Sequence, residues 1–553
     1  MDFIKVGSAC PKTKVADVIF NVENICSCID DAYNKDVKFL VFPELSITSY
    51  TCADLFLTST LINKSIEGIK LVCENSINKD MLIAVGCPLI HNNVLYNTAF
   101  IIFEGKILGI VPKSYIPNYS EFYEKRWFTA AAMLTDELVT LPFQENIPFG
   151  TNLIFAAGDY KFGIEICEDL WVAIPPSSYL SLLGANIIGN LSASNELVSK
   201  KDYRLSLIAN QSARCMSSYI YSSAGVHEST TDLLFSGHLV ISENGTILKE
   251  NNRFQRENEV ITSCIDVFKL NAERLKNLSY RDSSKIVPFK PKNINFNFKN
   301  TKINNFDRYI DKHPFVPSNE HEREERCKEI FNIQSSALAK RLEHTNLKKA
   351  VIGISGGLDS TLALLVIVKT FKLLGIDNSN IITITMPGFG TTDRTYNNAL
   401  TLCRELNTDL REINIVEASL QHFKDIGHDK NIHDVTYENV QARERTQILM
   451  DLANKEGGLL IGTGDLSELA LGWCTYNGDH MSMYAVNPSI PKTLVRYLVK
   501  YVAEKESTKE VAHTLLDILD TPVSPELLPK GEKGDIVQKT EDIVGPYELH
   551  DFF

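Results

Sequence analysis

The stretch GIEICEDLW, residues 163–171, places a thiol among carboxylates. Cys167 lies between Glu165 and Glu168, with Asp169 just beyond. A thiol reacts as its thiolate, and neighbouring carboxylates raise the pKa of a thiol rather than lower it. Cys167 is therefore either a small buried apolar residue, as most cysteines are, or a nucleophile that groups elsewhere in the chain activate.

Two charged residues at other predicted strand ends could provide this activation. Glu44 ends a strand in FPELSITSY, and Lys113 follows a strand in VPKSYIPNY. Polar groups at the carboxyl ends of separate strands can converge on one pocket. Glu44 would be the general base for the thiol of Cys167, and Lys113 would stabilise the oxyanion formed when the thiolate attacks an amide. Taken alone, each would more often be a solvated surface charge.

The second candidate site is the sequence SGGLDS, residues 355–360, between a predicted strand and a predicted helix. The glycine pair lets backbone N–H groups approach a phosphate, and the amino terminus of the helix favours negative charge. Asp359 would be a ligand of the Mg²⁺ that accompanies a nucleotide. A Gly-Gly pair by itself could be only a tight turn, but the complete SGGxDS pattern favours a phosphate site.

Alternating helices and strands must position these residues. In the first half, helical spacing of apolar residues predicts a helix over 16–33. Buried strands are predicted at 38–42, 82–86, 97–103, 106–111, 162–166, 186–190 and 219–223, and a hairpin turn at 243–246. In the second half, strands at 349–354, 381–385, 410–415 and 458–462 are separated by helices. That order is typical of a parallel, doubly wound α/β sheet.

A chain of 553 residues is too long for one hydrophobic core. Composition shifts at 290–318, which is rich in Asn and Lys and poor in aliphatic residues. Asn319 then begins a predicted helix with a charged, solvated face. We expect a first domain over 1–285, a linker over 286–318 and a second domain over 319–553.

Bulk composition excludes several classes of partner. The net charge of −13 argues against nucleic acid or an acidic membrane as the main partner. The longest apolar run, at 362–368, is far shorter than a membrane span, and the first residues do not have the pattern of a signal peptide. We therefore expect a cytoplasmic protein, with most of its 12 cysteines free.

The second half resembles the N-type ATP pyrophosphatases through SGGLDS, and the NAD⁺ synthetases through ENVQARERTQILMDLAN (438–454) and GTGDLSELALGWCTYNGDHMSMYAVNPSIPKTLVR (462–496). The resemblance implies a Rossmann-like fold of the adenine nucleotide α-hydrolase type. It places ATP at Gly353, Ile354, Ser355, Gly356, Gly357, Leu358, Asp359, Ser360 and Thr463. Deamido-NAD⁺ would contact Asn439, Glu468, Trp473, Cys474, Thr475 and Tyr476, and Asp359 with Glu468 would hold Mg²⁺. Arg443, Asp479 and Lys492 have suitable charges for further substrate contacts.

The first half resembles the nitrilase superfamily, specifically the glutaminase domain of glutamine-dependent NAD⁺ synthetases. Cys167, Glu44 and Lys113 are accompanied in this resemblance by PNYSEFYEKRWF, residues 117–128. The implied fold is an αββα sandwich, and Glu124 would be a second, supporting glutamate. The glutamine pocket would be lined by Tyr119, Ser194 and Lys200.

Together the two resemblances imply a ligase that hydrolyses glutamine and uses the ammonia for ATP-dependent amidation of deamido-NAD⁺ to NAD⁺. They also imply a homo-oligomer, and we expect a large one such as an octamer. Family members continue beyond GPYELHDFF for several helices, so we expect this chain to be truncated or to lack that tail, which supplies a lysine to the deamido-NAD⁺ site. Two alternatives stay open: a related amidotransferase with another acceptor, and a nucleotide-binding scaffold without catalysis.

Overall fold

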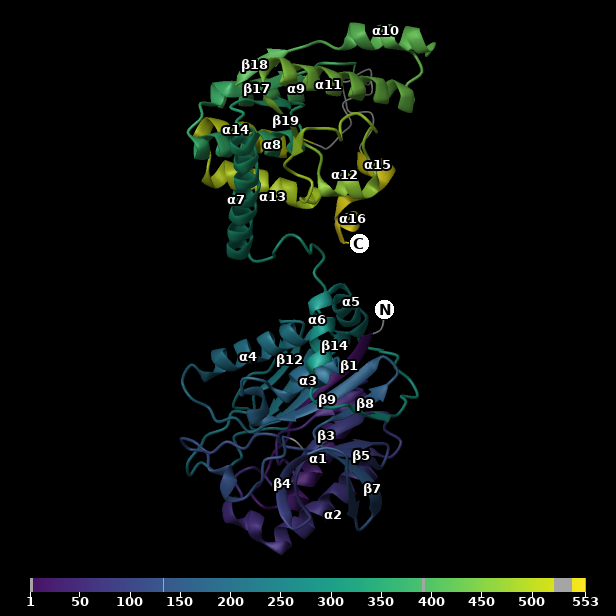
Figure 1. The fold of residues 1–553 in the computed structure, drawn as a ribbon, viewed down its shortest axis with the longest axis vertical. Coiled ribbons are helices and arrows are strands. Elements are labelled where there is room, and N and C mark those ends of the chain that lie inside the picture. The colour runs from purple at the N-terminus through teal and green to yellow at the C-terminus, as the bar shows by residue number, and fades with distance from the viewer. Residues whose placement is uncertain (1–2, 133, 390–392, 522–539, 553) are drawn as a thin grey trace. The chain divides into compact units, whose positions relative to one another are not determined.

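The computed structural model describes residues 3–132, 134–389, 393–521 and 540–552. The chain forms two compact units, Met1–Tyr309 and Ile310–Phe553 (Figure 1). Each unit has its own sheets and its own hydrophobic core. Within the described ranges, no helix is long and apolar enough to cross a membrane.

Two sheets form the centre of the first unit. The eight-stranded sheet contains, in spatial order, β14 (Glu259–Asp266), β1 (Phe3–Cys10), β2 (Phe39–Val41), β3 (Leu82–His91), β4 (Val94–Phe103), β5 (Lys106–Pro112), β7 (Gln144–Phe149) and β6 (Glu137–Leu141). The seven-stranded sheet contains β13 (Thr246–Glu250), β12 (Leu239–Glu243), β11 (Ser218–Ser223), β10 (Ile187–Ser192), β9 (Tyr160–Ile166), β8 (Leu153–Ala157) and β15 (Lys292–Asn295). Apolar side chains from both sheets share one core, so the sheets pack face to face.

Helices cover the two outer faces of this sandwich. The helices α1 (Val18–Asn34) and α2 (Ser59–Ser76) pack on the first sheet, and α3 (Pro176–Leu182) and α4 (Lys200–Cys215) pack on the second. Two further helices, α5 (Val267–Lys276) and α6 (Leu278–Ser283), follow β14. The predicted αββα sandwich is confirmed.

The segment 286–318 differs in part from the predicted linker. Residues Lys292–Asn295 form β15, which pairs in parallel with β8. The following aromatic residues Phe296 and Phe298 pack against Phe103 and Phe162. An apolar residue at every second position gives this segment a buried face, although its overall composition is polar.

A single parallel sheet forms the centre of the second unit. Its spatial order is β18 (Asp409–Glu412), β17 (Ile381–Thr385), β16 (Ala350–Gly353), β19 (Leu459–Gly462) and β20 (Tyr484–Ala485). From β16 the chain continues outward to β17 and β18 on one side, and it then returns to β19 and continues to β20 on the other side. The strands β16 and β19 therefore flank a topological switch point. The predicted doubly wound sheet is confirmed.

Helices lie on both faces of this sheet. The helices described in this unit are α7 (Glu320–Thr345), α8 (Leu358–Leu374), α9 (Asp393–Glu405), α10 (Val416–Ile426), α11 (Val435–Glu456), α12 (Leu466–Leu471), α13 (Lys492–Lys505), α14 (Lys509–Leu519), α15 (Thr540–Val544) and α16 (Tyr547–Phe552). One core contains residues of α7, α8, α9, α13 and α14, and another contains residues of α11. The side chain of Asn319 accepts hydrogen bonds from the first N–H groups of α7, as its sequence position predicts.

Candidate active sites

The first site lies where strands of both sheets of the first unit end. Glu44 follows β2, Lys113 follows β5, and Cys167 follows β9 and begins a short 3₁₀ turn. Glu124 begins another 3₁₀ turn, Glu124–Arg126. All four side chains are buried, so the structure brings together every residue predicted for the catalytic set.

Lys113 links the two glutamates. Its Nζ lies 2.6 Å from Oε1 of Glu44 and 2.9 Å from both carboxylate oxygens of Glu124. Burial alone would lower the pKa of this lysine, but the two glutamates and the nearby thiol raise it well above its ordinary value. The ammonium therefore stays charged, although its side chain is fully buried.

Glu44 has the properties of a general base. Asn97 and Lys113 both donate to its Oε1, whereas its buried Oε2 accepts no hydrogen bond from an N–H or O–H group of the described residues. Burial raises the pKa of this carboxyl to about 7, although the Lys113 ammonium acts in the opposite direction. The thiol of Cys167 also interacts with the carboxylate. A base with a pKa near neutrality, one free oxygen and an adjacent thiol can accept the thiol proton.

Cys167 sits at a sharp turn with a φ of 47°, which is unusual for a residue with a side chain. Burial and the neighbouring Glu44 raise the pKa of the thiol, and Lys113 lowers it. The resting group is therefore a thiol, and it needs a base to become a nucleophile.

The carboxylates next to Cys167 in sequence have other partners. Glu165 accepts hydrogen bonds from the N–H of Ser177, at 2.8 Å, and from the hydroxyl of Tyr219. Glu168 accepts from the hydroxyl of Tyr119 at 3.0 Å. The carboxylates that act most on the thiol, Glu44 and Glu124, come from distant segments, and Glu165 and Glu168 have other hydrogen-bond partners.

Asp169 is a buried residue of this site that the sequence analysis did not assign. Its carboxylate accepts hydrogen bonds from the N–H groups of Ile166 at 2.9 Å, Tyr115 at 2.8 Å and Ser114 at 3.3 Å. It thereby joins the turn that carries Cys167 to the segment that follows Lys113. Its position three residues after Ile166, at the end of a strand, is the only local signal of this role.

The residues predicted to bind glutamine lie close to this site. Lys200 acts electrostatically on Cys167, and its ammonium lies 5.1 Å from the ring of Trp171. Ser194 is buried, with a hydroxyl that has no partner among the described residues. Tyr119 is half-exposed and bonded to Glu168. Of the three, Lys200 is linked to Cys167 by charge and Tyr119 by its bond to the neighbouring Glu168, whereas Ser194 offers a buried hydroxyl in the segment that follows β10.

The second site is a cavity of about 770 Å³ in the second unit. It is lined by all the predicted ATP contacts, namely Gly353, Ile354, Ser355, Gly356, Gly357, Leu358, Asp359, Ser360 and Thr463. Gly356 has a φ of 84°, and a Cβ there would lie 2.1 Å from the carbonyl oxygen of Thr395. Only glycine fits this position of the loop.

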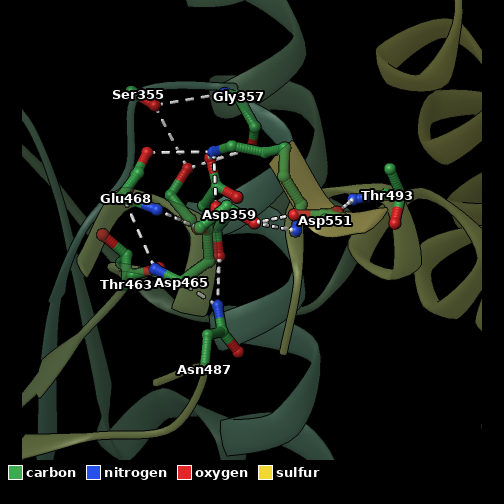
Figure 2. A network of polar contacts seen from close by, with 12 residues as sticks. Ser355, Gly357, Asp359, Thr463, Asp465, Glu468, Asn487, Thr493 and Asp551 are labelled. Atoms are coloured by element: carbon green, nitrogen blue, oxygen red, sulfur yellow. Dashed lines mark hydrogen bonds and ion pairs between the residues drawn. The ribbon is translucent and has the colours of Figure 1, made fainter. Parts of the chain in front are cut away.

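Three carboxylates meet beside the loop, as Figure 2 shows for Asp359, Asp465 and Glu468. One oxygen of each lies within 4.8 Å of the others. The ammonium of Lys492 lies 2.8 Å from Asp359, 2.6 Å from Asp465 and 2.9 Å from Glu468. Burial raises the pKa of Asp465 to about 6 and that of Glu468 to about 7.

This cluster has the donor set that Mg²⁺ prefers, which is carboxylate oxygen. Oδ1 of Asp359 is buried and has no hydrogen-bond partner among the described residues, so this oxygen is available as a ligand. The predicted pair Asp359 and Glu468 is brought together, and Asp465 joins it. Asp465 and Glu468 form a capping box at the start of α12, a spacing that the sequence GTGDLSE already displays.

The residues predicted for deamido-NAD⁺ are mostly in this cavity. Its wall includes Asn439, Glu468, Trp473, Cys474 and Thr475, together with Asp479 and Lys492. The hydroxyl of Thr475 donates to Asn439 at 2.8 Å. Tyr476, in contrast, is 81% exposed and is not part of the wall, and Arg443 donates to the carbonyl oxygen of Tyr476. Tyr547 lines the cavity and was not predicted.

Replacing Asp169 by Ala leaves three backbone N–H groups around a buried site without their acceptor. We expect Asp169→Ala to lower the free energy of unfolding by about 3 kcal/mol. The free energy of unfolding is measured by chemical denaturation, with the fluorescence of Trp127 and Trp171 as the signal. The exposed Asp159→Ala is the matched control, and equal stability of the two variants would contradict the role given to Asp169.

Both halves of the chain match known families. Residues 5–272 match the carbon–nitrogen hydrolase family, and residues 330–517 match the NAD synthase family. The glutamine-dependent NAD(+) synthetase of Mycobacterium leprae is 38% identical over 568 aligned positions, covering 100% of this chain and 82% of the relative. The proteins of that name from Mycobacterium tuberculosis and Aquifex aeolicus are 37% and 27% identical, covering 100% and 97% of this chain and 82% and 86% of those relatives. The chain therefore belongs to the family of glutamine-dependent NAD⁺ synthetases.

Proposed function

We propose that this protein amidates deamido-NAD⁺ to NAD⁺, with ATP as the energy source and glutamine as the nitrogen donor. The observation that carries the proposal is the presence, in one chain, of two complementary sites. One has a buried thiol beside Glu44 and Lys113, and the other has a carboxylate cluster beside a phosphate-type loop. The first site suits amide hydrolysis, and the second suits adenylation of an acid.

In the glutaminase site, Glu44 takes the proton of Cys167 as Sγ attacks the amide carbon of glutamine. The negative charge that develops on the amide oxygen is stabilised by the Lys113 ammonium. Glu44 then returns the proton to the leaving nitrogen, which departs as ammonia and leaves a thioester. A water molecule, deprotonated by Glu44, hydrolyses that thioester and releases glutamate. Glu124 holds Lys113 in place, and Tyr119, Ser194 and Lys200 bind the substrate.

In the synthetase site, the loop at 353–360 and Thr463 hold ATP. The wall formed by Asn439 and Trp473–Thr475 holds deamido-NAD⁺, whose carboxylate attacks the α-phosphorus while pyrophosphate leaves. Ammonia then attacks the acyl carbon of the mixed anhydride, and AMP departs. Asp359 and Glu468 would hold Mg²⁺ together with Asp465. When bound, Mg²⁺ supplies charge neutralisation at the phosphates.

We also propose that the protein is a homo-oligomer in the cytoplasm. Family resemblance supports a homo-oligomer that acts on small molecules. All 12 cysteines lie among the described residues and are free thiols, which supports residence in the reducing cytoplasm.

The choice of nitrogen donor tests the two-site proposal. We expect Cys167→Ala to abolish NAD⁺ formation from glutamine, because the nucleophile is lost, and to spare formation from ammonium chloride. AMP and NAD⁺ are measured with each donor, and Cys215→Ala, another buried thiol, is the control. Equal loss of both activities in Cys167→Ala would contradict separate sites.

Asp359 tests the synthetase site. We expect Asp359→Ala to lower NAD⁺ formation from either nitrogen donor at least 100-fold, because one of the phosphate-site carboxylates is removed. Glutamate release from glutamine checks that the first unit remains folded. The matched control is Asp377→Ala, an exposed aspartate in the same unit. Retained NAD⁺ synthesis in Asp359→Ala would refute its role.

The pKa of Glu44 predicts a pH dependence. Only the deprotonated carboxylate can accept the thiol proton, and burial raises this pKa to about 7. Glutaminase kcat/KM should therefore rise with pH between about pH 6 and about pH 8. Glutamate release from glutamine alone gives the profile without the titration of ammonia. A flat or falling profile over this range would show that Glu44 is not the base.

A further inference from the structure

The last described helix, α16, reaches the synthetase site. Tyr547, its first residue, is 4% exposed and lines the cavity. The ammonium of Lys492 lies 5.5 Å from the centre of the Tyr547 ring, within the range of a cation–π contact. Tyr547 therefore packs against the cation that holds the three carboxylates together.

Asp551, one turn later, connects two helices of the site. Its Oδ1 accepts a hydrogen bond from the hydroxyl of Ser467 at 2.5 Å, and its Oδ2 accepts from the N–H of Thr493 at 3.0 Å. Ser467 in turn accepts from the N–H of Lys492 at 2.8 Å. Figure 2 shows Asp551 and Thr493 beside the carboxylate cluster.

These contacts lie at the amino terminus of α13, next to the ammonium-bearing residue Lys492. Lys492 and Thr493 are the first residues of α13, whose N–H groups have no partner within the helix. Asp551 and Ser467 supply the missing acceptors, and the negative charge of Asp551 suits the amino terminus of a helix. Ser467 directly precedes Glu468 on α12. The same network thus fixes the backbone of Lys492 and that of one of its three carboxylate partners.

We propose that Asp551 is a positioning residue of the synthetase site, which holds α12 and α13 so that the Lys492 ammonium lies among Asp359, Asp465 and Glu468. The inference deepens the proposed function and rests on it. The ammonium and a divalent cation would compete for the same three carboxylates, because both are cations drawn to one cluster. Asp551 thereby influences both the charge presented to ATP and the affinity of the cluster for metal.

The test compares Asp551→Asn with Glu548→Gln in the full chain. Both variants remove one negative charge from α16, but the side chain of Glu548 is exposed whereas that of Asp551 bonds to Ser467 and Thr493. Asp551→Glu restores the charge, and Ser467→Ala removes one link of the network from the other side. Measurements are kcat and KM for ammonium-driven NAD⁺ formation, glutamate release, and binding of Mn²⁺ alone to the nucleotide-free protein by electron paramagnetic resonance.

We expect Asp551→Asn to lower kcat for ammonium-driven synthesis about tenfold while glutamate release stays unchanged. Mn²⁺ should bind several-fold more tightly, because a loosened Lys492 competes less for the carboxylates. Ser467→Ala should shift both quantities in the same directions, and Asp551→Glu should recover most of kcat. General unfolding of the unit would instead weaken Mn²⁺ binding, so the direction of that change separates positioning from mere stability.

The inference fails if Asp551→Asn matches Glu548→Gln in kcat, or if Mn²⁺ binding is unchanged or weaker. It also fails if Asp551→Glu recovers nothing. Absence of NAD⁺ formation by the unaltered protein with ammonium would overturn the proposed function itself. The unaltered protein therefore distinguishes the failure of one proposal from the failure of the other.

Discussion

A buried lysine surrounded by carboxylates is the interaction on which both sites depend. Lys113 lies between Glu44 and Glu124, and Lys492 lies among three carboxylates. Removing a charge from water is costly, and mutual attraction offsets that cost only when the geometry is good. Loss of one partner from such a cluster typically costs about 3–5 kcal/mol, because it leaves an uncompensated buried charge. Each cluster therefore fixes its strand ends and turns tightly.

Burial of these two clusters also shifts the pKa values of their carboxyl groups. Desolvation raises the pKa of Glu44 to about 7 and acts in the same direction on Glu468, while each lysine remains protonated. A carboxylate with a pKa near neutrality can take and return a proton within one catalytic cycle. In the second unit, the lysine balances the negative charge of a cluster that is suited to a metal ion. In the proposed function, the same arrangement of a lysine among carboxylates serves proton transfer in one unit and phosphate chemistry in the other.

Strand ends bring these groups together. In the first unit, β2 and β5 of one sheet and β9 of the other end at the same buried cluster, so residues separated by more than 100 positions become neighbours. In the second unit, β16 and β19 flank the switch point, which places the loop after one strand beside the carboxylates after the other. Rigid strands fix where each side chain begins, and short turns such as that of Cys167 decide where it points.

The sequence by itself determined the residue types, their local context and the family pattern: the helices and parallel strands, the SGGLDS loop, and Glu44, Lys113 and Cys167 at strand ends. These follow from periodicity and local motifs, which act over a few residues. It did not show that Glu165 and Glu168 have other partners, that Asp169 joins two turns, or that Asp465, Tyr547 and Asp551 belong to the synthetase site. Only the tertiary structure decided those points, because they depend on contacts between segments far apart in the chain and on the exclusion of water around them.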